Sequence, residues 1–223
     1  MAHVITYYTI QAHIDSVYCT ELVEKCKTVN NAIDRNMILL SLIDFAIFEQ
    51  SRRSLCICDT LLLEKSHEHV VNLCVLIGNI GISDKYRPTL FDNNLASNIV
   101  SALEYVDDID DKMKIVDSII RLCQTKSNVL QFTHAGIIPE LCNLLKIVHT
   151  DTQKKHVSFC IFWVSYLTYN KTMAVEYGCV ELMYNALKSM LNKPKQSHIL
   201  TDMNYFLKDE SIDNRYPICV MAN

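Results

Sequence analysis

The stretch Ala135-Gly136-Ile137-Ile138-Pro139-Glu140-Leu141-Cys142-Asn143-Leu144-Leu145 carries a helix stop, a helix start and an apolar helical face in one run. Gly136 follows a short helical segment, where a glycine with positive φ ends a helix at little energetic cost. Pro139 falls in the first turn of the next helix, where its missing N–H is not needed. The stretch therefore predicts two helices joined by a tight turn at Gly136.

The same order of features returns after roughly 42–44 residues, within the range of helical repeat proteins. In each copy a long apolar run is followed by a polar turn, a short helix and a second apolar helix. The long runs lie at residues 69–81, 113–123 and 157–167, and a shorter, weaker copy opens at 37–48. Because these runs are apolar on nearly every side, neighbouring copies must cover them on both flanks. The sequence therefore predicts a stack of helical repeats.

The amino-acid sequences of these copies resemble those of a known repeat family. Ala135-Gly136-Ile137-Ile138-Pro139-Glu140-Leu141 is similar to the consensus at the start of the second helix in armadillo repeats. Ile77-Gly78-Asn79-Ile80 resembles the centre of the third helix of that family. The resemblance covers residues 37–187. It implies an all-α, right-handed armadillo/HEAT-like α-solenoid of about four short repeats, whose third helices line a concave groove for partners.

The flanks of the repeats are predicted to be helical caps. Residues 7–25 carry apolar side chains at helical spacing and could cap the first repeat. Asn192-Lys193-Pro194-Lys195 is interpreted as a break, and residues 198–207 as an amphipathic helix that supplies the missing third helix of the last repeat. The predicted organisation is an N-terminal helical cap at 1–35, armadillo-like repeats at 36–191, a C-terminal capping helix at 192–210 and a flexible tail at 211–223.

Composition excludes several classes of function. The 223 residues contain 21 Lys and Arg against 25 Asp and Glu, a net charge of −4, and the densest charge run, at 104–111, is acidic. Nucleic-acid binding needs clustered positive charge, so it is not expected. Only 4 Gly and 4 Pro occur, which disfavours turn-rich β folds. No apolar run approaches the ~18–20 residues of a membrane span.

Ten cysteines raise the question of disulfides. The first twenty residues contain no Lys or Arg, so a secretory leader is not expected. Cys74, Cys123, Cys142 and Cys160 stand inside apolar helical runs, where a thiol behaves as a small hydrophobe. The sequence therefore predicts a reduced, intracellular protein, cytoplasmic with nuclear access left open.

Two clusters could suggest metal binding, and neither has suitable spacing. Cys56-Ile57-Cys58 with His67-Glu68-His69 separates its thiols by one residue, whereas structural zinc sites use two to four. Asp107-Asp108-Ile109-Asp110-Asp111 lacks the glycine and distal glutamate of an EF-hand, so Asp110 and Asp111 are expected to cap the next helix. No phosphate-binding glycine loop or nucleophile turn is present. The prediction is no metal, no cofactor and no catalytic residue.

The predicted groove can be compared with importin alpha, where armadillo third helices present a Trp and, one turn later, an Asn to basic peptides. Alignment on Asn79 places Phe45, Leu122 and Tyr166 at the Asn positions of the other copies. One turn earlier stand Ser41, Val75, Ser118 and Phe162. Only Asn79 matches that ladder, and Trp163 is expected to point into the core. Recognition of nuclear signals is therefore not favoured.

The remaining hypothesis is a less polar groove. We predict that an amphipathic or extended partner segment binds along Phe45, Val75, Asn79, Ser118, Leu122, Phe162 and Tyr166. The alternative is that these side chains pack the inner helices together or are covered by the tail.

The function that follows is a non-catalytic protein–protein interaction adaptor or scaffold. An alternative is a regulator or chaperone of small GTPases, because 76–81, the Asp-rich linker and the turn at 136–139 resemble the small-GTPase dissociation stimulator branch of the family. A third is an enzyme within an all-helical fold. The expected partner is a protein or peptide segment, with small GTPases as one candidate, and self-association through the solenoid ends is left open.

Overall fold

The computed structural model describes residues 17–18, 20–26, 28–29, 31–45, 67–85, 87–90, 94–190 and 193–207. All regular secondary structure within these ranges is helical. The chain divides into two compact units, Met1–Leu122 and Cys123–Asn223. No described helix combines the length and apolar character needed to cross a bilayer.

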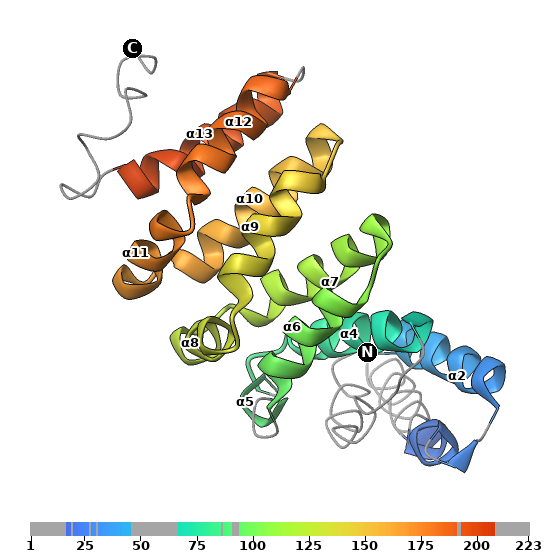
Figure 1. Cartoon of the computed structure of the whole chain (residues 1–223). Helices are drawn as coiled ribbons and strands as arrows, with labels where there is room; N and C mark the ends of the chain where they lie inside the picture. The colour runs from blue at the N-terminus through green and yellow to red at the C-terminus, as the bar shows by residue number, and fades with distance from the viewer. Residues whose placement is uncertain are drawn as a thin grey trace, which may run out of the picture. The chain divides into compact units, whose positions relative to one another are not determined.

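Among its described residues, the first unit has the long helices α2, α4 and α7, the shorter helices α5 and α6, and a helical stretch at 20–26. The long helix α4 packs between α2 and α7, and α6 packs against both α4 and α7 (Figure 1). The bounds of these helices are α2 (Ala32–Phe45), α4 (His67–Ile80), α5 (Arg87–Leu90), α6 (Leu95–Tyr105) and α7 (Ile109–Leu122). The long helix α4 is thus covered on both flanks by long helices, as the predicted stacking requires.

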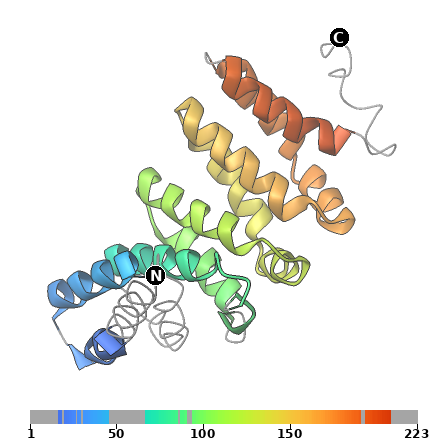
Figure 2. The same cartoon turned by 180° about the vertical axis from the view of Figure 1, so that it is seen from behind.

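The second unit repeats this arrangement. The long helices α10 and α13 lie side by side, as do the second helices α9 and α12 (Figure 2). The bounds are α8 (Lys126–His134), α9 (Ile137–Ile147), α10 (Asp151–Ser165), α11 (Thr168–Glu176), α12 (Cys179–Ser189) and α13 (Lys193–Leu207). The helix α13 packs on both α10 and α12.

The helix starts give the repeat a single period. The long helices α4, α7, α10 and α13 begin at His67, Ile109, Asp151 and Lys193, each 42 residues after the one before. The second helices α6, α9 and α12 begin at Leu95, Ile137 and Cys179, with the same spacing. The predicted break at Asn192–Lys195 is shorter than expected, because α13 starts at Lys193 and takes Pro194 into its first turn, where proline is tolerated.

The turns between helices follow the sequence signals. Gly136 has φ +86°, which confirms the predicted left-handed turn ahead of α9, and Gly178 has φ +76° at the equivalent place ahead of α12. The first helical position of α7 is Ile109, so Asp108 is the capping residue and accepts a 3.0 Å hydrogen bond from the Asp111 N–H. The expectation that Asp110 and Asp111 cap this helix was therefore wrong; both lie in its first turn.

The core is aliphatic with buried thiols. The largest fully buried side chains include Phe132, Phe206, Leu39 and Leu73. Cys74, Cys123, Cys142 and Cys160 are all buried, as predicted, and all four are free cysteines.

Candidate partner-binding faces on the long helices

The α4 and α7 helices approach closely because α4 carries glycine at the contact. A Cβ placed on Gly78 would lie 2.8 Å from the Cα, Cβ and Oγ of Ser118, and one on Gly81 would overlap the Leu122 side chain. Ser118 is 2% exposed and Leu122 is fully buried. Ser118 and Leu122 were predicted to line the groove. They lie instead between α4 and α7, in agreement with the alternative that such residues pack the inner helices together.

A side-chain contact reveals which residues occupy equivalent places on neighbouring helices. Arg121 donates through Nη1 to Asn79 Oδ1, and the two residues are separated by the 42-residue period of the helix starts. Asn79 therefore corresponds to Arg121 on α7, not to Leu122 one position further on. The alignment used for the predicted groove was shifted by one residue at α7, a rotation of about 100° on a helix.

With this register, each long helix presents one row of side chains that its neighbours leave open. We call it the open row; its members follow the helical spacing i, i+4, i+7, i+11 and are exposed or half-buried, except for Asn79, which is 9% exposed. In the first unit it consists of Ile33, Met37 and Leu40 on α2, Glu68, Asn72, Val75 and Asn79 on α4, and Asp110, Lys114, Asp117 and Arg121 on α7.

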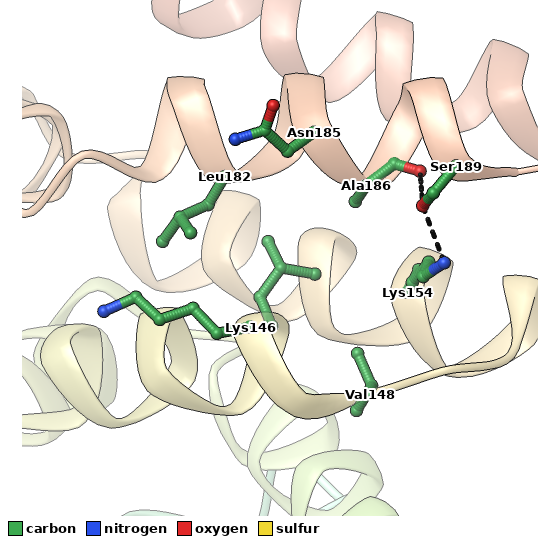
Figure 3. Close-up of a pocket in the computed structure, with 8 residues that line it drawn as sticks. Lys146, Val148, Lys154, Leu182, Asn185, Ala186 and Ser189 are labelled. Atoms are coloured by element: carbon green, nitrogen blue, oxygen red, sulfur yellow. Dashed lines mark hydrogen bonds between the residues drawn. The ribbon is translucent and has the colours of Figure 1, made fainter.

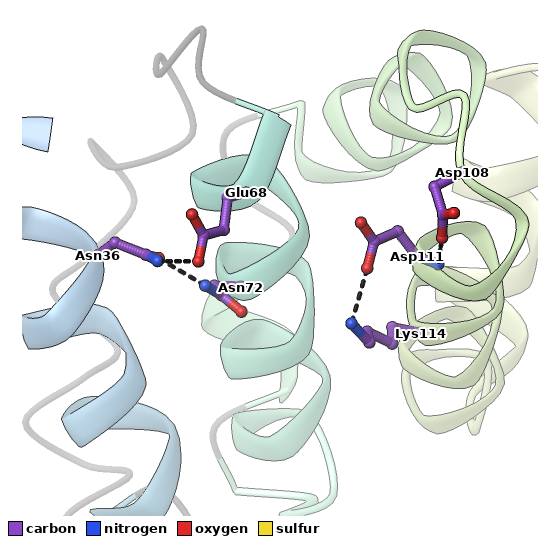
Figure 4. Close-up of polar contacts among 6 residues, drawn as sticks. All are labelled: Asn36, Glu68, Asn72, Asp108, Asp111 and Lys114. Atoms are coloured by element: carbon purple, nitrogen blue, oxygen red, sulfur yellow. Dashed lines mark hydrogen bonds and ion pairs between the residues drawn. The ribbon is translucent and has the colours of Figure 1, made fainter. Parts of the chain in front are cut away.

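The open rows of the first unit change from apolar to polar across its helices. Ile33, Met37 and Leu40 on α2 are 72%, 64% and 47% exposed. Between α2 and α4, Asn36 donates to Glu68 and accepts a 2.6 Å hydrogen bond from Asn72 (Figure 4). Polar groups at the α2–α4 contact thus pair with one another, while α2 exposes an apolar strip.

On α7 the open row carries charges of both signs. Lys114 forms a 2.7 Å ion pair with Asp111 in the preceding turn, and Figure 4 shows this pair beside the Asp108 cap. The pair is largely exposed, so its contribution to stability is small, below about 1 kcal/mol. Since Asp110 and Asp117 stand in the same row as Lys114 and Arg121, α7 offers no continuous field of one sign.

In the second unit the C-terminal half of the open row on α10 is aromatic. On α10 it consists of Thr152, His156, Phe159 and Trp163. Phe162 stacks against Phe159 at 6.4 Å between ring centroids, and the Trp163 ring meets both in edge-to-face geometry at 6.0 and 6.2 Å. All three residues are half-buried, and Tyr166, one turn further on, is 39% exposed. We refer to Phe159, Phe162, Trp163 and Tyr166 as the α10 aromatic cluster.

The helix α13, which packs against α10, has polar residues in its open row and contains a buried acid. His198 and Thr201 in its open row are exposed. Asp202 is only 6% exposed, and burial raises the pKa of its carboxyl to about 7 against a smaller opposing effect of the Lys155 charge. Its Oδ2 has no hydrogen-bond partner among the described residues. A buried carboxylate of this kind destabilises the folded state when ionised.

Apart from Ser118 and Leu122, the described groove residues lie on α4 and α10. Val75 and Asn79 lie in the open row of α4, and Phe162 and Tyr166 belong to the α10 aromatic cluster. Phe45 is the last residue of α2, and its side chain lies outside the described residues.

Two residues of the long helices were misjudged from sequence. Arg121 was missed, and Trp163 was placed in the core, whereas the residue is half-buried and its Nε1 atom is buried. Gly136 and Gly178 are 42 residues apart in the sequence. This period aligns Asn79 with Arg121 and Trp163, and it could have identified both residues as members of the open rows.

Of the residues considered for a metal site, His67 and Glu68 make polar contacts within the chain. Cys56 and Cys58 lie outside the described residues, while the His67 Nε2 atom is 2.9 Å from the Tyr105 carbonyl and Glu68 accepts from Asn36. No group of three potential metal ligands occurs in the part of the chain that the structure describes. Burial raises the pKa of Cys74 to about 12 and that of Cys142 to about 11, so these thiols are poor nucleophiles.

Comparison with known proteins identifies the fold through structure and not through sequence. No family model matches the chain, and no curated protein matches it. A designed armadillo repeat protein in complex with the peptide (KR)4 is similar over 88% of this chain and 85% of its own, with a TM-score of 0.76 at 17% identity. A computationally designed armadillo repeat protein for modular peptide recognition gives the same values.

A natural armadillo structure is similar to the same degree. A structure concerned with the interaction between cadherin and beta-catenin matches over 92% of this chain and 39% of its own, with a TM-score of 0.76 at 14% identity. These likenesses, together with the all-helical repeat of 42 residues, show that the chain adopts the armadillo-repeat solenoid fold.

Proposed function

We propose that this protein is a non-catalytic adaptor that binds an extended segment of a partner protein along the open rows of its long helices. The observation that carries the proposal is the α10 aromatic cluster. The four aromatic side chains of this cluster lie on one face of α10. The other helices of the second unit do not cover them fully. Partly exposed aromatic groups of this kind are typical anchors in protein interfaces.

The fold supports the same mode of action. One similar structure holds the peptide (KR)4, and another concerns an interaction between cadherin and beta-catenin. Armadillo solenoids present extended surfaces of this type to partners. In this chain the open row of α7 mixes Asp117 with Lys114 and Arg121, so uniformly basic peptides are not favoured. We expect the partner segment to bring apolar side chains to the α10 aromatic cluster.

Selection from a displayed library of random peptides on the purified full chain would test the proposal. The selected peptides should contain aromatic or aliphatic residues, and Trp163→Ala should weaken their binding about tenfold or more, the effect of removing an interface anchor. Tyr177→Ala is a matched control, because Tyr177 is a 52% exposed aromatic residue at the end of α11, outside the open rows. Equal affinity for the wild type and Trp163→Ala would contradict the proposal.

A nucleotide-release assay separates this function from the GTPase regulator that the sequence resemblance also suggested. An adaptor should leave the release rate of a panel of small GTPases unchanged while it binds the selected peptides. Accelerated release from one GTPase, abolished by the selected peptide, would assign the open rows to that partner.

A further inference from the structure

A cleft lies between the second helices α9 and α12 of the second unit, apart from the open rows. Its volume is about 330 Å³. The apolar part of its lining comes from Leu145, Val148, Leu182 and Ala186 (Figure 3). A space of this size admits a short peptide side chain with its flanking groups, at the lower end of the usual range for ligand pockets.

Two lysines stand at opposite ends of this cleft, as Figure 3 shows. The Lys154 ammonium donates a 2.7 Å hydrogen bond to Ser189 Oγ, which itself donates to the Ala186 carbonyl at 2.8 Å. This chain of bonds fixes Lys154 at the rim. The other ammonium, Lys146, donates to Asn143 Oδ1 at 3.2 Å. Among the described residues neither lysine pairs with a carboxylate.

The lining combines this positive charge with hydrogen-bonding groups and has no acid of its own. Asn185 and Ser189 are both exposed and complete the lining without contributing a charge. An apolar floor between two ammonium groups is complementary to an aliphatic side chain between two carboxylates. A highly charged polyanion fits less well, because the chain as a whole has a net charge of −4.

We propose that this cleft is a second docking site, which binds an acidic segment of a partner protein that carries an aliphatic residue between two carboxylates. The aliphatic side chain packs on Leu145 and Leu182, and the two carboxylates pair with Lys146 and Lys154. The site is independent of the open rows, because it is built from the second helices and from the first turn of α10.

The test uses the full chain labelled with ¹⁵N and an N-acetylated, C-amidated tripeptide Glu-Leu-Glu as the probe. Titration should shift the amide resonances of residues 182–189 and leave those of 159–163 unchanged. Gln-Leu-Gln should bind about tenfold more weakly, and Lys154→Gln should weaken binding of Glu-Leu-Glu about five- to tenfold, with the loss reduced at high salt. Lys188→Gln is the matched control; Lys188 is exposed on α12 outside the lining of the cleft, with its ammonium 5.2 Å from the Tyr184 ring centroid.

Three outcomes would overturn the proposal. Equal affinity for Glu-Leu-Glu and Gln-Leu-Gln would mean that charge is not recognised. An equal loss in Lys188→Gln and Lys154→Gln would mean that the peptide responds only to net charge. The chain itself contains an acidic run with one aliphatic residue, Asp209-Glu210-Ser211-Ile212-Asp213. Tighter probe binding by the full chain with Asp209→Asn, Glu210→Gln and Asp213→Asn would assign the cleft to this tail in place of a partner.

Discussion

Arg121 on α7 donates a hydrogen bond to Asn79 on α4, and the two residues occupy the same position in consecutive 42-residue copies. This contact identifies the register between α4 and α7. The register in turn determines which side chains of these helices are exposed and which lie between them. A shift of one residue would exchange Arg121 with the buried Leu122 and remove the polar group from the surface.

The close approach of α4 and α7 should make Gly78 intolerant of a side chain. Gly78→Ala would place a Cβ 2.8 Å from Ser118, so one helix must move, at a cost of about 1–3 kcal/mol. Urea unfolding followed by circular dichroism measures the loss. Ser101→Ala, on the exposed side of α6, is the control and should leave the midpoint unchanged. An unaltered midpoint in Gly78→Ala would show that the helices are further apart.

The turn at Gly136 should be sensitive to backbone conformation alone. Its φ is +86° and no atom lies within 4 Å of the place that a Cβ would take, so Gly136→Ala introduces strain without a clash. We expect a loss of about 1–2 kcal/mol in the free energy of unfolding. Gly136→Asn should lose less, since asparagine adopts left-handed conformations more readily. Equal losses for Ala and Asn would point to a packing effect instead.

Replacing the buried acid on α13 should stabilise the protein in a pH-dependent way. The pKa of Asp202 is raised from its ordinary value of 3.8 to about 7, so the folded state favours the protonated carboxyl. Stability contributed by this group is therefore present below about pH 4, falls as the pH rises to about 7 and stays low above that. Asp202→Asn should raise the unfolding free energy at pH 8 by about 1–3 kcal/mol and have much less effect at pH 4.

The control for this prediction is Glu181→Gln, which neutralises an exposed acid on the neighbouring helix α12. It should change stability little at either pH. A gain in Asp202→Asn that is the same at pH 4 and pH 8 would show that side-chain shape, and not ionisation, is responsible.

The buried thiols should be protected from alkylation. Six described cysteines are buried, and burial raises the pKa of five of them, Cys26, Cys74, Cys123, Cys142 and Cys179. A variant with Cys19, Cys56, Cys58 and Cys219 replaced by Ser should react slowly with iodoacetamide when native at pH 8 and rapidly in urea. Rapid modification of one thiol in the native variant would identify a reactive cysteine and reopen an enzymatic role.

Much of this architecture could be predicted from local signals. Gly136, Gly178 and Pro139 mark turns through backbone chemistry that needs no tertiary context, and the apolar runs identify the helices. The face that each long helix exposes could not be read in the same way, because Leu122 and Trp163 are both apolar and their exposure depends on the register between copies. Capping at Asp108 was missed for a similar reason: in a run of four aspartates, only the exact helix start decides which one accepts the bond.

The junctions ahead of α7 and α10 perform one task with different residues. Asp108 caps the first and Thr150 the second, and each accepts a hydrogen bond from a backbone N–H three residues on. The helix start requires a side-chain oxygen atom that accepts this hydrogen bond. More than one residue type can supply that atom. Two junctions can therefore keep the same architecture while their residues differ, which fits a chain that matches an armadillo structure in fold at 14% identity and matches no family model.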